Sequence, residues 1–431
     1  MKRLSLFPNT TKIEHDTLII CGKSLIDLVD EYGTPLYIYD RATLDAAIAE
    51  YKSALQNYPA PSDITYAGKA YLCKAIAQWT QEHNLWIDCT GEDELAIAAA
   101  ARVTRERILV HGVNKSDADL RAASEQAGTL VIDHLDELGR TIQLFLKHKS
   151  NFPNAWLRFQ PGLAVDTHHA HTQTGQFTSK FGMTLEEVFE AVELCKRHSL
   201  PLEGIHFHQG SNFRDPAPLK LAIDRALDLV KQIGFKDSWH FSPGGGWSVA
   251  YHEDELPNPL IQDYVNAVVE STVRGCQQRG LALPHLHLEP GRSIIARAGV
   301  AIYRVGAIKQ RGERTWLLID GGMADNPRRA LYGAKYSALP VTGLSREMTE
   351  RVSIGGPYCE SGDVILEDLP FPKVEVGELI AVPVSGAYHL SMSSNYNGAR
   401  RPAVVWLDGN GARLIQRRET IDDLMARDLS L

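Results

Sequence analysis

The chain has 431 residues, of which 44% are hydrophobic and 23% are charged, and its formal net charge is -8. A chain of this length can bury substantial cores and is longer than most single compact domains, so two domains are the starting expectation. The negative charge and the absence of a Lys/Arg run disfavour the phosphate contacts that nucleic-acid binding needs. A small-molecule partner is therefore favoured over nucleic acid.

The N-terminal stretch MKRLSLFPNTTKIEHD has no sustained apolar core, and no later stretch approaches the roughly 20 apolar residues that span a bilayer. We expect a soluble, cytoplasmic protein without a membrane partner. The cysteines are scattered without CxxC or metal-finger spacing, which indicates neither a disulfide framework nor a structural zinc site. They are Cys21, Cys73, Cys89, Cys195, Cys276 and Cys359.

The first 40 residues contain two strand-like runs, TLIICG and PLYIYD. From about residue 64 to 290, short β-prone runs then alternate with helical patterns such as LDELGRTIQLFLKHK. Eight such units in this length predict an α/β fold, a (β/α)₈ TIM barrel. The predicted strands are 64–70, 85–90, 108–113, 129–134, 155–160, 202–208, 238–243 and 285–290.

After residue 300 the pattern changes to strand-like runs such as AIYRVGAIKQ, TWLLIDGG and RPAVVWLDG, separated by Gly, Pro and Asp turns. This pattern of strand-like runs and turns predicts a β-rich second domain. The strand-like runs of the first 40 residues are expected to pair with it, so that the barrel is an insertion. In a TIM barrel the active site gathers where strands run into their following loops, so residues at strand ends become candidates.

Lys69 stands at the end of the first predicted barrel strand, within YAGKA, where small neighbours let a cofactor approach the backbone. A desolvated lysine amine is nucleophilic and forms imines with aldehyde cofactors. The alternative is a solvated surface lysine. The glycine run Gly244, Gly245 and Gly246 follows the seventh strand, where barrels build phosphate sites from loop amides, although tight turns use glycine as well.

LEPGRS follows the eighth strand and contains Glu289 and Arg292. A carboxylate here can pair with a pyridine nitrogen, and the arginine can bind a carboxylate or phosphate through paired N–H donors. The alternative is a structural ion pair. HFHQGSN ends strand six, so alternation places His206 and His208 on the same side, where one ring could stack on a planar cofactor and Ser211 could donate to its phosphate.

A metal site is the competing interpretation of this histidine pair, although no carboxylate-rich or HExxH-like pattern organises it. Its further ligands would be His111, His168, His169 and His171. In the second domain, Cys359 and Glu360 of PYCESGD offer a proton donor and an acceptor for a substrate amine. The alternative for this cysteine is a small buried apolar residue.

Taken in order along the chain, the motifs GTPLYIYD, YAGKA, SKFG, HFHQGS, PGGGW, EPGRS, DGGM, RRALYGA, CESGD and GAYHLSMSSNYN resemble the fold-type III pyridoxal 5'-phosphate (PLP) decarboxylases, and among them the diaminopimelate decarboxylases. The resemblance covers nearly the whole chain. It implies a PLP-binding barrel with a C-terminal β-sandwich domain that the N-terminal segment joins. The implied ranges are 1–40 for that segment, 41–300 for the barrel and 301–431 for the sandwich.

The resemblance also implies roles for individual residues. Lys69 would hold PLP as a Schiff base, and Cys359, from the partner subunit of a homodimer, would reprotonate the substrate after loss of carbon dioxide. Matching positions imply cofactor contacts from His208, Ser211, Gly244, Gly245, Gly246, Glu289, Gly291, Arg292 and Tyr388. Substrate contacts are implied for Arg292, Arg328, Tyr332, Glu360 and Tyr388.

The implied reaction is decarboxylation of meso-diaminopimelate to L-lysine, a step of lysine biosynthesis. The chain departs from the family pattern in ways that affect the choice of substrate. The departures are Gln209, the sequence RRALY, Lys335-Tyr336 where the family often has histidine, and a histidine-rich loop at residues 166–175. Decarboxylation of ornithine, lysine, arginine or a carboxylated polyamine is the enzymatic alternative. A PLP-dependent racemase and a decarboxylase-like regulatory binding protein are the others.

Overall fold

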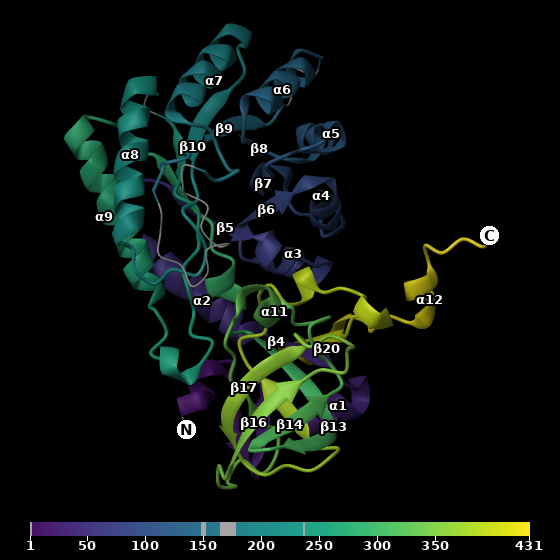
Figure 1. Ribbon diagram of the computed structural model, residues 1–431. Helices are drawn as coiled ribbons and strands as arrows, with labels where there is room; N and C mark the ends of the chain where they lie inside the picture. The colour runs from purple at the N-terminus through teal and green to yellow at the C-terminus, as the bar shows by residue number, and fades with distance from the viewer. Residues whose placement is uncertain (1, 148–151, 164–177, 236–237) are drawn as a thin grey trace. The chain divides into compact units, whose positions relative to one another are not determined.

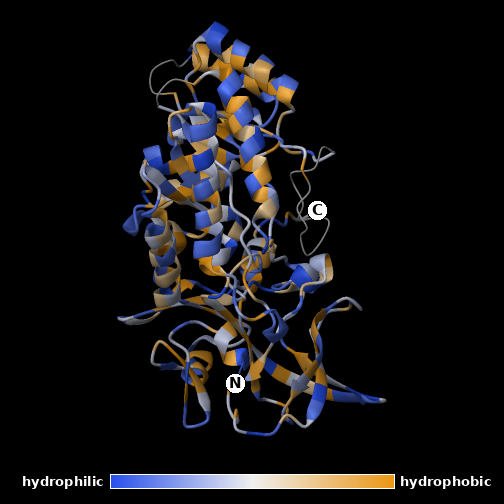
Figure 2. Ribbon diagram, turned by 90° about the vertical axis from the view of Figure 1, so that its left-hand side faces the viewer, coloured by the Kyte–Doolittle hydropathy of each residue, from blue (hydrophilic) through white to orange (hydrophobic). Residues whose placement is uncertain are grey.

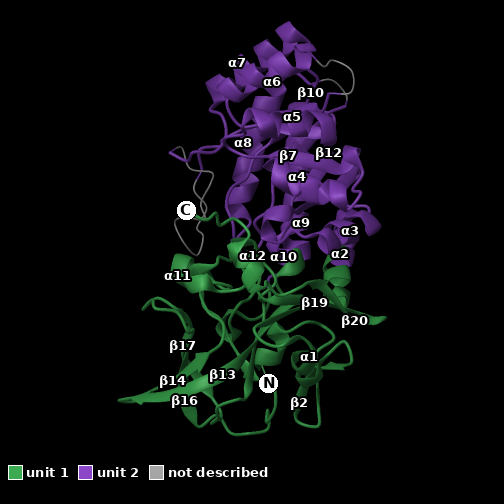
Figure 3. Cartoon of the chain, turned by 90° about the vertical axis from the view of Figure 1, so that its right-hand side faces the viewer, with its two compact units in different colours: residues 1–48, 249–258, 294–431 green, residues 49–248, 259–293 purple. Residues whose placement is uncertain are grey.

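The computed structural model describes residues 2–147, 152–163, 178–235 and 238–431. The chain forms two compact units, each continuous in space but not in sequence (Figure 3). The first combines residues 1–48, 249–258 and 294–431, and the second combines residues 49–248 and 259–293. The second unit contains the barrel.

Eight parallel strands of the second unit close into a barrel, in the order β10-β11-β12-β5-β6-β7-β8-β9 (Figure 1). Each predicted strand is present, and most end two or three residues earlier than the sequence pattern suggests. The strands are β5 Ser62–Ala67, β6 Trp86–Thr90, β7 Ile108–His111, β8 Thr129–Ile132, β9 Asn154–Arg158, β10 Leu202–His206, β11 His240–Ser242 and β12 His285–Leu288. The predicted TIM barrel is confirmed.

Helices follow the barrel strands and carry apolar residues on one face, which Figure 2 shows as alternating blue and orange along each ribbon. In α8, for example, Leu219, Ala222, Ile223, Ala226 and Val230 are buried at helical spacing. The helices are α3 Lys74–Glu82, α4 Gly91–Ala100, α5 Asp117–Gln126, α6 Leu135–Lys147, α7 Leu185–His198, α8 Ala217–Ile233, α9 Ile261–Arg279 and the short α10 Arg292–Ile295. A preceding helix, α2, spans Arg41–Leu55.

Hydrogen-bonding side chains define where two of these helices begin. Ser116 and Asp119 form a capping box at the start of α5, and Thr184 and Glu187 form another at the start of α7. Each box satisfies backbone N–H groups that the first turn of a helix leaves unpaired. At the other end of α7, Ser199 adopts a left-handed conformation that stops the helix. These capping residues therefore fix where α5 and α7 begin and where α7 ends.

The first unit is built on a mixed sheet with the main order β17-β16-β14-β13-β4-β19-β20, and β18 pairs with β13 and β15. A small three-stranded sheet, β1-β2-β3, lies in the same unit. The strands are β1 Lys12–Glu14, β2 Thr17–Ile20, β3 Lys23–Ser24, β4 Leu36–Asp40, β13 Gly299–Arg311, β14 Arg314–Ile319, β15 Leu339–Pro340, β16 Glu350–Gly355, β17 Val364–Phe371, β18 Leu379–Val382, β19 Ala403–Asp408 and β20 Gly411–Gln416. Its helices are α1 Leu25–Tyr32, α11 Arg328–Tyr332 and α12 Ile421–Met425.

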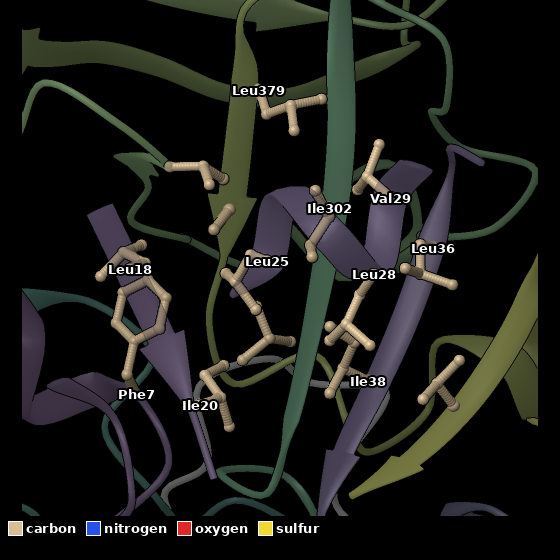
Figure 4. Packing of buried hydrophobic residues seen from close by; sticks show 14 of the residues in the cluster. Phe7, Leu18, Ile20, Leu25, Leu28, Val29, Leu36, Ile38, Ile302 and Leu379 are labelled. Carbon is tan, nitrogen blue, oxygen red and sulfur yellow. The ribbon is translucent and has the colours of Figure 1, made fainter. Parts of the chain in front are cut away.

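Strand β4 joins the N-terminal segment to the C-terminal strands, because it pairs antiparallel with β13 and parallel with β19. The expectation that the N-terminal segment belongs to the β-rich domain is therefore confirmed. Leu36 and Ile38 of β4 pack in an apolar cluster with Ile302 of β13 and residues of α1 (Figure 4). Alternation turns Tyr37 and Tyr39 to the opposite face of the strand, where both side chains are also buried.

None of the helices in the described part of the chain combines the length and the apolar character that a bilayer span requires.

Candidate active site

Lys69 follows β5 in a single turn of 3-10 helix, Gly68–Ala70, at the carboxyl end of the barrel strand. Its side chain is exposed, whereas Gly68 and Ala70 on either side are buried. A Cβ atom at Gly68 would lie 2.6 Å from the carbonyl oxygen of Asp88, so only glycine fits there without a shift of the neighbouring strand end. The chain thus presents the amine of Lys69 at the carboxyl end of β5, on tightly packed backbone.

Glu289 directly follows β12 at the same end of the barrel and is buried. Its Oε1 accepts a hydrogen bond from Ser242 Oγ at 2.6 Å, and its Oε2 lies 3.2 Å from Nε2 of His206 and 3.3 Å from Nε2 of His111. Burial opposes ionisation, but the two facing imidazoles hold the pKa of Glu289 well below its usual range. The site therefore contains a buried carboxylate that is ionised at neutral pH.

Burial lowers the pKa of His206 to about 3, against the opposing effect of Glu289. The ring is consequently neutral at neutral pH, and its Nε2–H group donates to the carboxylate of Glu289. Alternation along β10 also explains why His206 reaches the barrel interior. His206 and His208, which were predicted to lie on the same side, have different partners. His206 bonds Glu289, whereas His208 contacts the glycine turn.

The predicted glycine turn follows β11 and packs against the segment after β12. Gly244 and Gly246 have φ angles of +75° and +103°, which L side chains rarely adopt. A Cβ atom at Gly245 would collide with the carbonyl oxygen of Glu289. The backbone N–H of Gly245 approaches Nδ1 of His208 at 3.4 Å. Glycine is therefore required here by close approach of backbone segments as well as by backbone conformation.

Arg292 opens α10 and is buried, and its Nη2 donates to Oγ of Ser211 at 3.0 Å. A Cβ atom at Gly291 would lie 2.9 Å from Cβ of Ala70, so the residues after β12 also pack against the Lys69 turn. His208 is half-buried, and burial, with the cations Lys69 and Arg158, lowers its pKa well below the usual value. This ring is neutral as well.

In the β-rich unit, Arg328 is buried and part of a chain of hydrogen bonds. Its Nη1 donates to the hydroxyl of Tyr336 at 2.7 Å, and that hydroxyl lies 2.8 Å from Nε2 of His389. Nδ1 of the same imidazole is 3.2 Å from the hydroxyl of Tyr37 on β4. The guanidinium also lies over the ring of Tyr251, 4.6 Å from its centroid. Arg328 is thus a cation whose position is fixed from two sides.

The other predicted residues of this unit have different surroundings. Tyr332 and Tyr388 are half-buried, and Tyr388 has a φ of +62°. Cys359 and Glu360 are exposed. The backbone N–H of Cys359 donates to Oδ1 of Asn397 at 3.0 Å, which connects the CESGD and SMSSNYN motifs. The interpretation of Cys359 as a buried apolar residue is wrong.

Sequence reasoning missed four residues that position this machinery: Ser242, Tyr251, Tyr336 and His389. Ser242 immediately precedes PGGGW, and His389 follows Tyr388, so a search of the positions next to each motif would have found both. Tyr336 stands out in the sequence only as a departure from the family pattern, and Tyr251 carries no local signal because it meets Arg328 only through the fold. His168, His169, His171 and the loop at 166–175 lie outside the described residues.

The sequence of this chain matches a known protein family. Residues 42–296 match the family described as "Pyridoxal-dependent decarboxylase, pyridoxal binding domain". The chain belongs to this family, and its cofactor is PLP.

Similarity to individual proteins extends over nearly the whole chain. It is 36% identical to the diaminopimelate decarboxylase of Actinosynnema pretiosum over 98% of this chain and 95% of that protein. It is also 36% identical to the diaminopimelate decarboxylase of Bacillus subtilis, covering 96% of each. The crystal structure of the M. jannaschii diaminopimelate decarboxylase in complex with L-lysine matches with a TM-score of 0.91 at 28% identity, covering 98% of both chains.

Proposed function

We propose that the chain removes one carboxylate of meso-diaminopimelate and releases L-lysine and carbon dioxide. One observation carries the proposal: an accessible amine, an ionised buried carboxylate and a glycine turn with a buried arginine meet at the carboxyl end of one barrel. Relatives of matching length are diaminopimelate decarboxylases, which supports the choice of substrate.

The donor set fits PLP group by group. Lys69 offers an amine to the aldehyde, and Glu289 offers a carboxylate to the pyridine nitrogen. Arg292, Ser211 and the backbone of Gly244 to Gly246, with Gly291 beside them, offer charge and hydrogen bonds to a phosphate. Bound there, PLP supplies an electron sink for the pair of electrons that the departing carboxylate leaves behind.

Each protein group then has a distinct task. Glu289 keeps the pyridine nitrogen protonated because its own negative charge favours the cationic form of its partner. His206 and Ser242 hold that carboxylate in place. His208 is neutral and half-buried, so it can stack on a flat ring without placing a second positive charge beside Lys69.

Substrate recognition is assigned to residues that the family resemblance selected. Arg292 and Arg328 would bind carboxylates through paired N–H donors, which suits a substrate with a carboxylate at each end. Tyr332, Tyr388 and Glu360 would complete the contacts, with Glu360 facing an ammonium and Tyr388 also reaching the cofactor. Cys359 would return a proton to the carbon that has lost carbon dioxide.

A homodimer with shared active sites is part of the proposal. The exposure of Cys359 and Glu360 supports it, because groups that act on a partner's substrate must be accessible before assembly. The cytoplasmic location stays a prediction from the sequence.

The test is a product assay on the PLP-saturated protein. Meso-diaminopimelate, ornithine, lysine and arginine are supplied separately, and carbon dioxide and the amine product are measured. We expect L-lysine from meso-diaminopimelate and a much smaller turnover of the others. Preferred turnover of ornithine, lysine or arginine would overturn the choice of substrate.

Lys69→Ala is the variant that tests the cofactor anchor. It should abolish turnover and remove the visible absorbance of the bound cofactor, because it removes the amine assigned to the cofactor aldehyde. Lys74→Ala, at an exposed position at the start of α3, is the matched control and should keep both. Full activity of Lys69→Ala with bound PLP would contradict the assignment.

A further inference from the structure

Three histidines meet inside the barrel at the end opposite Lys69. His240 and His285 are the first residues of β11 and β12 and pair directly in the register of these strands. His287 lies two residues beyond His285, so alternation turns it to the same side. One ligand nitrogen from each residue lies within 4.8 Å of the other two. We call these three residues the histidine cluster.

Distances within the histidine cluster are short. Nδ1 of His240 is 2.9 Å from Nε2 of His287, and the rings of His285 and His287 stack with centroids 4.5 Å apart. Trp156 and Trp86 pack against His287, each with a centroid distance of 4.8 Å. His287 is fully buried, whereas His240 and His285 are half-buried, so the cluster has one enclosed and two partly accessible imidazoles.

Two carboxylates stand on the outer side of the histidine cluster. Oδ2 of Asp63, on β5, lies 2.8 Å from Nε2 of His285. Oε2 of Glu203, on β10, lies 3.9 Å from Nε2 of His240. A histidine whose one nitrogen donates to a carboxylate presents the lone pair of the other nitrogen, which is the usual arrangement around metal-ligating histidines. Asp63 therefore orients His285 with Nδ1 as the free ligand atom.

Hydrogen bonding among the rings does not satisfy all of their polar atoms. Nδ1 of His287 is buried and has no hydrogen-bond partner among the described residues. Imidazole nitrogens are ligands that suit a borderline-soft divalent cation.

We propose that the histidine cluster binds a divalent transition metal of the Zn²⁺ class. His240, His285 and His287 are the ligands, and Asp63 is the hydrogen-bond partner that orients His285. Tetrahedral Zn²⁺ with bonds of 2.0–2.1 Å sets ligand nitrogens about 3.3 Å apart, so the ligand atoms, now within 4.8 Å of one another, would draw together and the stacked rings would turn on binding. The fourth position would take a water molecule. The ion would link β11 and β12, and through Asp63 also β5.

This site is independent of the proposed decarboxylase function. Its ligands stand at the amino ends of strands, where barrels carry stabilising rather than catalytic groups. The expected role is structural, and the expected effect of the ion is a higher melting temperature.

The test is a titration of the PLP-saturated full-length protein with Co²⁺ alone, followed by visible absorption. His168, His169 and His171 are replaced by Gln in every sample, so that their side chains do not bind the ion. We expect a single Co²⁺ per chain with the strong visible band of tetrahedral coordination, displaced by Zn²⁺. Melting curves with and without the ion give a second readout.

Substitutions distinguish metal binding at the histidine cluster from metal binding elsewhere on the protein. His240→Gln and His285→Gln should remove the band and the metal-dependent rise in melting temperature, and Asp63→Asn should weaken binding roughly 10- to 100-fold. His198→Gln, the same change in α7, is the matched control and should change neither. Absence of the band from the parent protein, or equal binding by His285→Gln and the parent, would overturn the proposal. If the Gln variants fail to fold, weakened binding by Asp63→Asn decides for the site and unchanged binding decides against it.

Discussion

At the scale of single residues, the active site depends on how burial and neighbours set the charge of each group. Glu289 is buried yet ionised, because His206, His111 and Ser242 surround it with donors. His206 itself is neutral, so the carboxylate keeps its negative charge for another partner. A buried charge without such donors would be costly, and here its free partner is expected to be the pyridine nitrogen of PLP.

Glu289→Gln should lower kcat roughly 100-fold or more while the protein stays folded, because the amide keeps the shape but cannot favour a protonated pyridine. The bound cofactor should also change its visible spectrum. Steady-state kinetics and an absorption spectrum of the variant check both. Glu193→Gln, an exposed carboxylate of α7, is the control. A Glu289→Gln enzyme with unchanged kcat would show that the carboxylate is only structural.

At the scale of elements, the sequence predicts the barrel well because each of its signals is local. Eight β-prone runs, helical periodicity and the capping residues of α5 and α7 are all visible in short windows. Lys69, Gly245 and Glu289 were found because strand ends of a TIM barrel share one face. Tyr251 was missed because its contact with Arg328 joins segments far apart in the chain, whereas Tyr336 lies only eight residues after Arg328 and no motif assigned it a role.

Gly245→Ala tests the close packing of the turn after β11. Its added methyl would meet the carbonyl oxygen of Glu289, and overpacking against backbone should lower the free energy of unfolding by roughly 1–3 kcal/mol. Affinity for PLP should fall as well. Gly139→Ala, inside α6 with open space around it, should instead stabilise by up to about 1 kcal/mol. Urea unfolding of both variants measures the difference, and equal effects would contradict the steric argument.

Glu94, in the first turn of α4, makes the free energy of unfolding depend on pH. Burial and the nearby Asp88 raise the pKa of Glu94 to about 7, although the backbone N–H of Thr90 donates to it. The folded protein therefore holds a proton on Glu94 that the unfolded chain releases near its ordinary pKa of 4.5. The free energy of unfolding must then fall as pH rises from about 4.5 to 7, and the full cost remains above pH 7.

Glu94→Gln removes that cost, so the melting temperature of the variant relative to the wild type should rise between pH 5 and pH 8. Cofactor-free protein is used, because PLP binding adds its own contribution to stability. Glu92→Gln, an exposed position in the same turn, controls for the loss of a negative charge at a helix N-terminus. A difference that stays constant or shrinks with pH would show that the sign is wrong.

At the scale of the whole molecule, neither unit is one continuous stretch of sequence. The β-rich unit takes residues 1–48 from the start of the chain, 294–431 from its end and 249–258 from its middle. In the middle piece, the ring of Tyr251 lies under the guanidinium of Arg328, and the carboxylate of Glu253 accepts a hydrogen bond from Arg3. No local pattern marks such a piece, which is why sequence reasoning treats the barrel region as uninterrupted.

The proposed homodimer predicts that two inactive variants restore activity when they share a dimer. If Cys359 of one subunit acts on substrate held at Lys69 of the other, then Lys69→Ala and Cys359→Ala are each inactive for different reasons. Mixing the two after subunit exchange creates heterodimers in which one site has both mutations and the other has none. Random exchange makes half of the dimers mixed, so about a quarter of the wild-type activity should return.

The control mixes Lys69→Ala with the double variant Lys69→Ala/Cys359→Ala, which creates no intact site and should stay inactive. Differently tagged subunits, purified sequentially through both tags, establish that exchange has taken place. Recovery of activity would place Cys359 and Lys69 of different subunits in the same reaction. Tagged heterodimers without activity would instead mean that each chain completes its own site, and the exposure of Cys359 would then need another explanation.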